Sequence, residues 1–326
     1  MLTVFSLCAT GLRRLDRSSD AALPEESTWL DLLEPTVEEE RLVEARLGVE
    51  VPTREEMREI ESSSRLYEED GALYLTATVV TKLDTQLPEN AQVTFILKGP
   101  RLVTNRYVDT LPFRRFVAYT EKHPQTNTSA PVILVALLES IVNRIADVIE
   151  RVSSDMDAVS AEVFNRNHLK GKSQGLHRDF RKLLERTGQS GELIAKARES
   201  LASLSRLVAF VQQSTIPLPP EVRTRLRTLS KDVVAMSDHA SFLGSNLNFI
   251  LDATLGMINI DQNNILKIFS VATVVLLPPS VIGAIFGMNF DKIPTAHEPW
   301  GFTAAVVLMV LSAIIPSLVF KMRGWL

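Results

Sequence analysis

Residues 268–286 read IFSVATVVLLPPSVIGAIF and contain no charged side chain. A second uncharged stretch, residues 299–320, reads PWGFTAAVVLMVLSAIIPSLVF. A helix needs about 20 residues to cross the hydrocarbon layer of a bilayer, and each stretch is close to that length. A pair of buried core helices is the alternative, but two such stretches with only a short polar link between them favour a membrane. The sequence therefore predicts two transmembrane helices and makes membrane lipid a partner.

The basic residues that flank these stretches predict their orientation. Lys267 precedes the first stretch, and Lys321 and Arg323 follow the second, whereas residues 289–298 have no basic excess. Because basic residues concentrate on the cytoplasmic side, we expect the large N-terminal part and the C-terminus to be cytoplasmic. The expected location is the inner (plasma) membrane.

Composition excludes several other classes. The net charge of −4 lacks the basic excess of a nucleic-acid-binding protein, so nucleic acid is not expected as a partner. Cys8 is the single cysteine, which excludes an intrachain disulfide. No nucleophile with a nearby base, phosphate-binding glycine loop or close metal-ligand cluster stands out, so an enzyme is not expected. The opening MLTVFSLCAT has no basic residue ahead of its apolar part and predicts a strand, not a signal peptide.

Residues 1–125 are expected to form a cytoplasmic domain that mixes helices and strands. Thr36 followed by Glu39 is a capping box that predicts a helix to Leu47. The acidic runs 38–40 and 68–70 could be metal ligands, but such runs are more typical of solvated faces. Turn signals, Pro88-Glu89-Asn90 among them, separate runs that predict strands, at 72–83, 92–97 and 102–107.

The rest of the chain predicts long helices. Apolar residues recur at spacings of three and four over 132–167 and 176–213, which predicts a cytoplasmic helical hairpin within residues 126–215. Gly171 and Gly175 mark the expected turn between the two helices. Pro219 and Pro220 end that pattern, and Pro220 can open the next helix. The remaining segments are expected to be a stalk helix continuing into the first span (216–287), a periplasmic loop (288–299), and the second span with its cytoplasmic tail (300–326).

A series of residues that is small or polar for most of its length runs along the stalk helix and into the first span. Alternating steps of three and four keep its members on one face of a supercoiled helix. Inside a segment that is otherwise Ile, Val, Leu and Phe, large apolar residues would be expected there instead. We call the series the polar seam: Asp252, Gly256, Asn259, Asn263, Leu266, Ser270, Thr273, Leu277, Ser280, Ala284 and Gly287.

Two explanations of the polar seam remain open at this point. Small and hydroxyl residues can form a face on which membrane helices approach closely. Alternatively, several copies of the helix surround an axis, and the seam lines a water-filled path with oxygen ligands at its cytoplasmic mouth. Such oxygens suit a hydrated hard cation such as Mg²⁺. A chain with one such helix must form a homo-oligomer to make a pore.

The first span closes with Gly287-Met288-Asn289. At the outer end of the first of two C-terminal spans, this tripeptide resembles the signature of the CorA family of magnesium transporters. The segment from Gly256 through Pro278-Pro279 to the terminal Trp325-Leu326 resembles the family too. The resemblance is strong over roughly the last 80 residues and extends only to the order of elements before them.

The resemblance implies a funnel-shaped homopentamer in which the first span lines a pore. Gly287, Met288 and Asn289 would form the selectivity filter, with Asn289 as a metal-binding residue. Leu266 and Phe269 would match a hydrophobic gate, and Phe269 is assigned from the resemblance alone. The implied pore-lining residues are Asn263, Leu266, Phe269, Thr273, Leu277 and Ser280.

The resemblance also implies that Mg²⁺ is both transported and regulatory. Cytoplasmic Mg²⁺ would gate the pore by binding carboxylates between subunits. Asp252 would face the wide cytoplasmic vestibule. Asp232 and Asp238 are guesses at regulatory ligands, made from their position only.

The sequence departs from the family pattern after the filter. Residues 293–295 read Ile-Pro-Thr where many relatives carry Met-Pro-Glu, so Glu298 becomes the candidate acidic residue of the outer loop. This leaves open the related ZntB branch, which transports Zn²⁺. Co²⁺ and Ni²⁺ are further candidate ions beside Mg²⁺. A non-conducting membrane-anchored scaffold or sensor is the alternative from another functional class.

Overall fold

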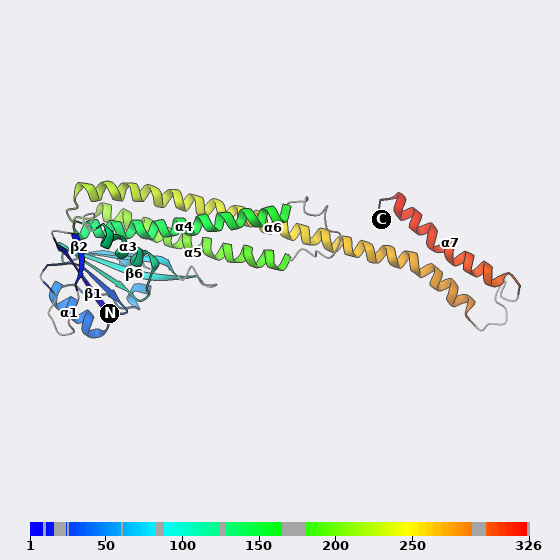
Figure 1. The fold of residues 1–326 in the computed structure, drawn as a ribbon, viewed down its shortest axis with the longest axis horizontal. Coiled ribbons are helices and arrows are strands. Elements are labelled where there is room, and N and C mark those ends of the chain that lie inside the picture. The colour runs from blue at the N-terminus through cyan, green and yellow to red at the C-terminus, as the bar shows by residue number, and fades with distance from the viewer. Residues whose placement is uncertain are drawn as a thin grey trace. The chain divides into compact units, whose positions relative to one another are not determined.

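The computed structural model describes residues 1–8, 11–15, 24, 26–59, 61–81, 88–123, 128–164, 180–288 and 298–324. The chain divides into two compact units, Met1–Leu251 and Asp252–Leu326. The first contains a sheet and long helices, and the second contains the two apolar segments (Figure 1).

A seven-stranded sheet organises the first unit within the described residues. Its strands are β1 (Leu2–Cys8), β2 (Gly11–Leu15), β3 (Ser27–Leu33), β4 (Leu66–Glu69), β5 (Ala72–Thr81), β6 (Glu89–Lys98) and β7 (Arg101–Arg106). The order is β2-β1-β3-β7-β6-β5-β4, and every neighbouring pair is antiparallel except β3 and β7, which are parallel. The predicted first strand is confirmed as β1. The predicted turn at Glu89-Asn90 is wrong, because these residues pair with Thr81 and Val80 and extend β6.

The sheet is buried on both faces. All ten residues of β5 are buried. One face carries a cluster of aliphatic side chains with Val43 of α1 (Val37–Leu47), and the other carries Trp29. The ring of Trp29 lies 4.3 Å from that of Phe5 and 5.5 Å from that of Phe116, measured between centroids. Such area removed from water is the main stabilisation of the unit.

A buried ion pair joins the two parallel strands. Asp31 on β3 accepts two hydrogen bonds from Arg106 on β7, at 3.0 Å from Nε and 2.7 Å from Nη2. Thr104 Oγ1 donates to the same carboxylate at 2.7 Å and accepts from Trp29 Nε1 at 3.0 Å. Burial alone would lower the pKa of Arg106, but its hydrogen bonds to Asp31 outweigh burial and raise it. The network therefore favours the charged form of Arg106 inside the domain.

The predicted capping box is confirmed at the start of α1. Thr36 Oγ1 accepts from the Glu39 backbone N–H, and the Glu39 carboxylate accepts from the Thr36 backbone N–H. The Glu39 carboxylate also accepts from the Leu2 N–H and lies 2.9 Å from the Met1 amine. Glu39, part of an acidic run, is thus bound to the protein itself. The helix ends at Gly48, whose φ of 60° suits a residue without a Cβ.

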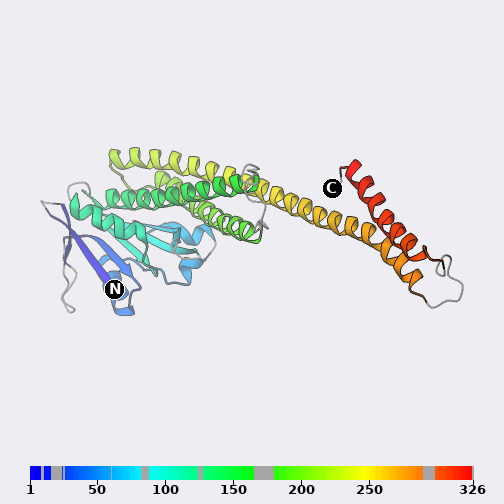
Figure 2. The same ribbon diagram turned by 45° about the vertical axis from the view of Figure 1, so that its right-hand side comes forward.

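Long helices complete the first unit, as Figures 1 and 2 show. Besides the short η1 (Glu56–Arg58) and α2 (Ser62–Arg65), they are α3 (Leu111–Lys122), α4 (Ala130–Phe164), α5 (Phe180–Gln213) and the first part of α6 (Pro220–Phe286). The two predicted helices of the hairpin are confirmed as α4 and α5, and the turn predicted at Gly171 and Gly175 lies outside the described residues. The structure adds α3, which the sequence analysis had not separated from the mixed region.

Hydrogen bonds and an ion pair fix the helices of this unit to one another and to the sheet. On α5, Ser200 Oγ donates to the Thr78 carbonyl at 2.6 Å, and Ser203 Oγ accepts from the Thr78 N–H at 3.0 Å. The pairing of β5 with β4 ends at Leu75. The two serines therefore supply hydrogen-bond partners for the backbone of Thr78, which lies beyond that pairing. Arg225 near the start of α6 binds Glu139 of α4 through two hydrogen bonds, at 3.0 and 2.6 Å.

The second unit holds the end of α6 and α7 (Gly301–Met322). As predicted, α6 begins at Pro220 and continues through Pro278 and Pro279 to Phe286. Both helices are long and apolar enough to cross a membrane. In the most apolar 18-residue window of each, only 6% of the residues are buried within the chain. The apolar surfaces of both helices are therefore largely uncovered within the single chain.

Candidate ion pathway

The polar seam lies entirely on the exposed surface of α6. Each of its eleven members, from Asp252 to Gly287, is exposed in the single chain. Less exposed residues of the same part of α6 follow a second stripe that includes Val271, Val275, Ile282 and Phe286. At about 100° per residue, this stripe lies roughly half a turn from the seam.

The second stripe is the face that meets α7. A Cβ added to Gly283 would lie 3.6 Å from Met309 Cε of α7. Near the other end of the span, Lys267 Nζ donates to the Gly324 carbonyl at 3.5 Å. The sequence analysis did not identify this contact face, although Gly283, a small residue away from the seam, could have indicated it. Because α7 occupies this face, α6 presents the seam away from its own partner helix.

The hydroxyl groups of the seam donate their hydrogens to the helix itself. Ser270 Oγ donates to the Leu266 carbonyl at 2.8 Å, Thr273 Oγ1 to Phe269 at 2.8 Å, and Ser280 Oγ to Leu276 at 2.9 Å. A hydroxyl has one hydrogen and two acceptor lone pairs, so the side of each group left available is an acceptor. The seam can therefore receive hydrogen bonds but offers few donors through these groups. That pattern suits cations and the water around them.

The two assigned gate residues are both exposed. Leu266 is 62% exposed on the seam, and Phe269 is 68% exposed beside it. With Ile268, which is 69% exposed, they form a contiguous apolar surface of the kind that lipid or another protein covers.

The filter tripeptide is partly within the described residues. Gly287 N–H donates to the Gly283 carbonyl at 3.0 Å, so the helical pattern continues one residue beyond α6. A Cβ at position 287 would come within 3.2 Å of that same carbonyl oxygen, which is a tight contact. Met288 is 49% exposed. Asn289 lies outside the described residues.

The carboxylates assigned to ion binding are scattered. Asp232, Asp238 and Asp252 are all exposed on α6, and Glu298 is exposed ahead of α7. Within the part of the chain that the structure describes, no three His, Cys, Asp or Glu side chains come together to hold a metal ion. The structure therefore does not bring the two guessed ligands into a site within one chain.

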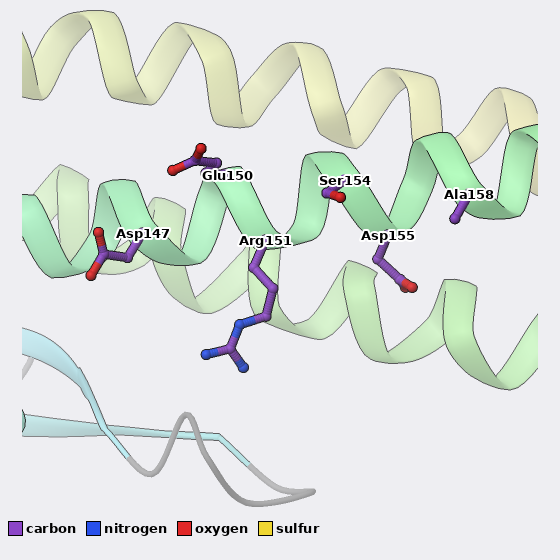
Figure 3. Close-up of a pocket in the computed structure, with 6 residues that line it drawn as sticks. All are labelled: Asp147, Glu150, Arg151, Ser154, Asp155 and Ala158. Atoms are coloured by element: carbon purple, nitrogen blue, oxygen red, sulfur yellow. The ribbon is translucent and has the colours of Figure 1, made fainter.

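A hollow of about 580 Å³ along α4 carries further carboxylates. Figure 3 shows its lining on α4, with Asp147 and Asp155 about two turns apart. Both have basic partners: Asp147 lies 3.1 Å from Arg115 Nη1, and Asp155 lies 2.5 Å from Arg186 Nη2. These acidic groups are therefore used in holding neighbouring helices together.

Comparisons with known proteins agree with the order of elements along the chain, in which two apolar C-terminal helices follow a mixed domain. A family model described as CorA-like Mg²⁺ transporter protein matches residues 24–322. The chain is 31% identical over 326 residues to the magnesium transport protein CorA of Pasteurella multocida, and the match covers 100% of both chains.

Solved structures show the same fold. The complete CorA magnesium transporter of Methanocaldococcus jannaschii has a TM-score of 0.77 at 19% identity, over 100% of this chain and 99% of that one. The cytoplasmic domain of ZntB from Vibrio parahaemolyticus has a TM-score of 0.59 at 9% identity, over 80% of this chain and 98% of that one. At these identities the likenesses concern the fold alone. The family model and the full-length relative together show that the chain belongs to the CorA-like Mg²⁺ transporter family.

Proposed function

We propose that this protein transports Mg²⁺ across a membrane along a path lined by α6 from several copies of the chain. The observation that carries the proposal is the exposed polar seam, because it continues through an apolar span on the face opposite α7. A scaffold that only anchored itself in the membrane would gain nothing from exposing hydroxyl and amide groups there. The full-length relatives named as magnesium transport proteins support the same function.

The chemistry of the seam suits a hydrated divalent ion. Mg²⁺ loses its water reluctantly, and neutral oxygens do not offset that cost. Hydroxyls whose hydrogens are bound to the helix can still accept hydrogen bonds from the water shell of the ion. The path therefore conducts Mg²⁺ with most of its water in place, and Co²⁺ and Ni²⁺ follow the same route.

We place the selectivity filter at Gly287, Met288 and Asn289. The last carbonyl groups of a helix lack N–H partners and carry partial negative charge, which favours cations at the end of α6. Each copy contributes one such helix end at Phe286. Asn289 adds a neutral side-chain acceptor for the water around the ion.

We propose that the assembly is a homo-oligomer, and the family resemblance favours a pentamer. One chain presents one seam, so a closed path requires a ring of copies. Cross-linking in detergent should give a closed series that ends at five. A chain that conducts as a monomer would contradict this part of the proposal.

We further propose that cytoplasmic Mg²⁺ closes the path. Asp232, Asp238 and Asp252 are exposed, so each is available to an ion shared with another copy. A ligand shifts an equilibrium only through its different affinities for the two states, so these ions must bind more tightly in the closed form. Protease digestion of α6 should therefore differ between millimolar Mg²⁺ and chelator. In the proposed orientation, Asp232, Asp238 and Asp252 are on the cytoplasmic side. The N- and C-termini are then cytoplasmic too, and Glu298 is in the outer loop.

Flux of Mg²⁺ into liposomes tests the path. Asn263→Ala removes a seam acceptor, whereas Asn264→Ala removes the same group from an exposed neighbouring position outside the seam. We expect at least about 10-fold slower uptake for Asn263→Ala, since a lost hydrogen bond to a charged or polarised partner is worth about 1.5–3 kcal/mol. Asn264→Ala should resemble the unmodified protein, and equal effects of both would remove the seam from the path.

The filter has its own test. Asn289→Ala should abolish Mg²⁺ uptake, and Asn289→Asp should bind cations more tightly but discriminate less among them. Unchanged uptake in Asn289→Ala would contradict the assignment of this residue. Selective Zn²⁺ flux would place the protein in the ZntB branch, and no ion flux at all would favour the scaffold.

A further inference from the structure

Three prolines interrupt the two transmembrane helices. Pro278 and Pro279 lie inside α6, and Pro316 lies inside α7. Proline has no N–H, so each removes the bond to the carbonyl four residues earlier and pushes its ring against that turn. The carbonyls that lose these bonds belong to Val274, Val275 and Ser312. Each helix therefore has one weakened turn within its apolar length.

The two weakened turns lie at the same level. In the antiparallel pair, Lys267 reaches Gly324 at one end and Gly283 lies beside Met309 at the other. Counting inward from both contacts places Pro316 level with Leu276, and Ser312 level with Ser280. The gap in α7, from Ser312 to Pro316, thus overlaps the gap in α6, from Val274 to Pro279.

The weakened turns also lie on the less exposed side of each helix. Pro278, Pro279, Ser312 and Pro316 are all part-buried, in a unit whose helices are otherwise largely bare. Their neighbours point elsewhere: Leu276 and Leu277 are 64% and 59% exposed, and Ile314 and Ile315 are 46% and 59% exposed. The prolines of one helix therefore lie on the side that meets the other helix.

We propose that these prolines form one joint, and that Pro316 of α7 is a positioning residue for the ion path. It lies off the seam and acts through α6. A helix bends where its hydrogen-bond ladder is broken, and close packing against a straight neighbour would prevent that bend. Because α7 is broken at the same level, the pair bends as a unit and carries the seam with it. The link to transport rests on the proposed function, whereas the joint itself does not.

The joint has a physical rationale in the bilayer. A carbonyl without a partner is costly in hydrocarbon, and proline is tolerated in membrane helices where a neighbouring helix shelters the freed group. The serines beside the joint keep their hydrogens within their own helices: Ser312 Oγ donates to Met309 and Ser317 Oγ to Ala313, both at 2.8 Å. Facing the gaps toward each other shelters the freed carbonyls from lipid without stiffening either helix.

Amide hydrogen exchange of the full-length protein in detergent tests the joint without reference to transport. Pro316→Ala restores an N–H to α7 and leaves α6 unchanged in sequence. If the joint moves as one, exchange should slow in α6 itself, over residues 280–286, by about 5-fold, which is the effect of about one net hydrogen bond. A purely local role of Pro316 would slow exchange only in α7. Leu318→Ala, at a 55% exposed position of α7, is the control and should leave α6 unchanged.

Mg²⁺ flux into liposomes supplies the second measurement. Pro316→Ala and the double variant Pro278→Ala/Pro279→Ala should each slow uptake by about 5-fold for the same reason, and the triple variant should be no slower than either. Multiplied effects in the triple variant, or unchanged exchange in α6 after Pro316→Ala, would overturn the joint. An unmodified protein that takes up no Mg²⁺ would instead overturn the proposed function and leave the exchange result to decide the joint.

Discussion

Strand β5 and the membrane-spanning part of α6 are built from much the same residues, but their side chains are covered in different ways. Ala, Leu, Thr and Val supply nine of the ten residues of β5 and nine of the 19 residues of the span 268–286. All ten residues of β5 are buried by the chain's own sheet and helices, whereas 6% of the most apolar window of α6 is buried. Apolar composition therefore predicts that a segment is buried, but it does not predict whether the chain itself or something outside it covers the side chains. For β5 the cover is this chain, whereas most of the apolar surface of α6 is uncovered within the single chain.

Polar groups differ between the two regions in the same way. In the sheet, the Asp31 carboxylate is satisfied by Arg106 and Thr104 of the neighbouring strand. On α6, the seam hydroxyls satisfy their hydrogens locally and leave their acceptors outward. The first arrangement serves stability, and the second leaves the hydroxyl acceptors available to groups outside the chain.

The largest expected effect comes from the buried ion pair. Asp31→Ala leaves the Arg106 charge buried without its main partner, which costs about 3–5 kcal/mol of folding stability. Urea unfolding of the purified protein in detergent, followed by tryptophan fluorescence, measures the loss. Asp147→Ala removes a carboxylate from a half-exposed pair and should cost at most about 1 kcal/mol. Equal losses from the two variants would contradict the view that stability resides inside the sheet.

A matched pair of leucines tests the comparison directly. Leu97 of β6 is 0% exposed and Leu277 of α6 is 59% exposed. Leu97→Ala should cost about 2–5 kcal/mol because it leaves a cavity in a packed core. Leu277→Ala should change unfolding by about 0.5 kcal/mol or less and instead raise Mg²⁺ flux, since it widens the proposed path. Similar unfolding losses for both would show that Leu277 is packed against another part of the assembly.

A smaller effect is expected at the helix cap of α1. Thr36→Ala removes the acceptor for the Glu39 backbone N–H and should cost about 1 kcal/mol. Thr36→Ser keeps the hydroxyl and should restore the urea midpoint. Failure of the serine variant to do so would mean that the methyl group of Thr36, not its oxygen, is responsible.

The smallest expected effect is a pH dependence carried by Glu39. Burial alone would raise the pKa of Glu39, but hydrogen bonds from the Met1 amine and from the Thr36 and Leu2 N–H groups outweigh it and lower that pKa. The carboxylate therefore stabilises the fold above its unfolded pKa, about 4.3, and the contribution is lost as the pH falls through the lower folded value. Glu39→Gln should flatten the dependence of the melting temperature on pH below about 5. An unchanged acid profile would rule out this contribution.

Local signals in the sequence predicted local structure well. Thr36 with Glu39 predicted the cap, Pro220 predicted the start of α6, and the absence of charge after Lys267 predicted the span. Each of these depends on neighbours a few residues away, where backbone chemistry decides. By contrast, α3 was not separated from its surroundings, although Pro112 with buried Phe113 and Phe116 at a spacing of three could have indicated it.

Pairings between distant residues could not be predicted from spacing. Asp31 and Arg106 are 75 residues apart and meet only because β3 and β7 are parallel neighbours. The α7 contact face and the matched levels of Pro278 and Pro316 likewise depend on how two helices are aligned. The periodicity did predict the seam, because a single helix orders its own side chains, but the periodicity of one helix does not predict what covers the seam.

The uninterrupted course of α6 has a consequence for how such a protein can change over generations. Inserting one residue between Asn263 and Ser270 would turn the side chains before it by about 100° relative to those after it, so the two halves of the seam would no longer share a face. Seven residues at once would restore the alignment, because the seam repeats every seven. Insertions and deletions should therefore be found mainly in the loops and rarely in α6. In α6, one inserted or deleted residue would divide the seam between two faces of the helix, although the residue types would remain.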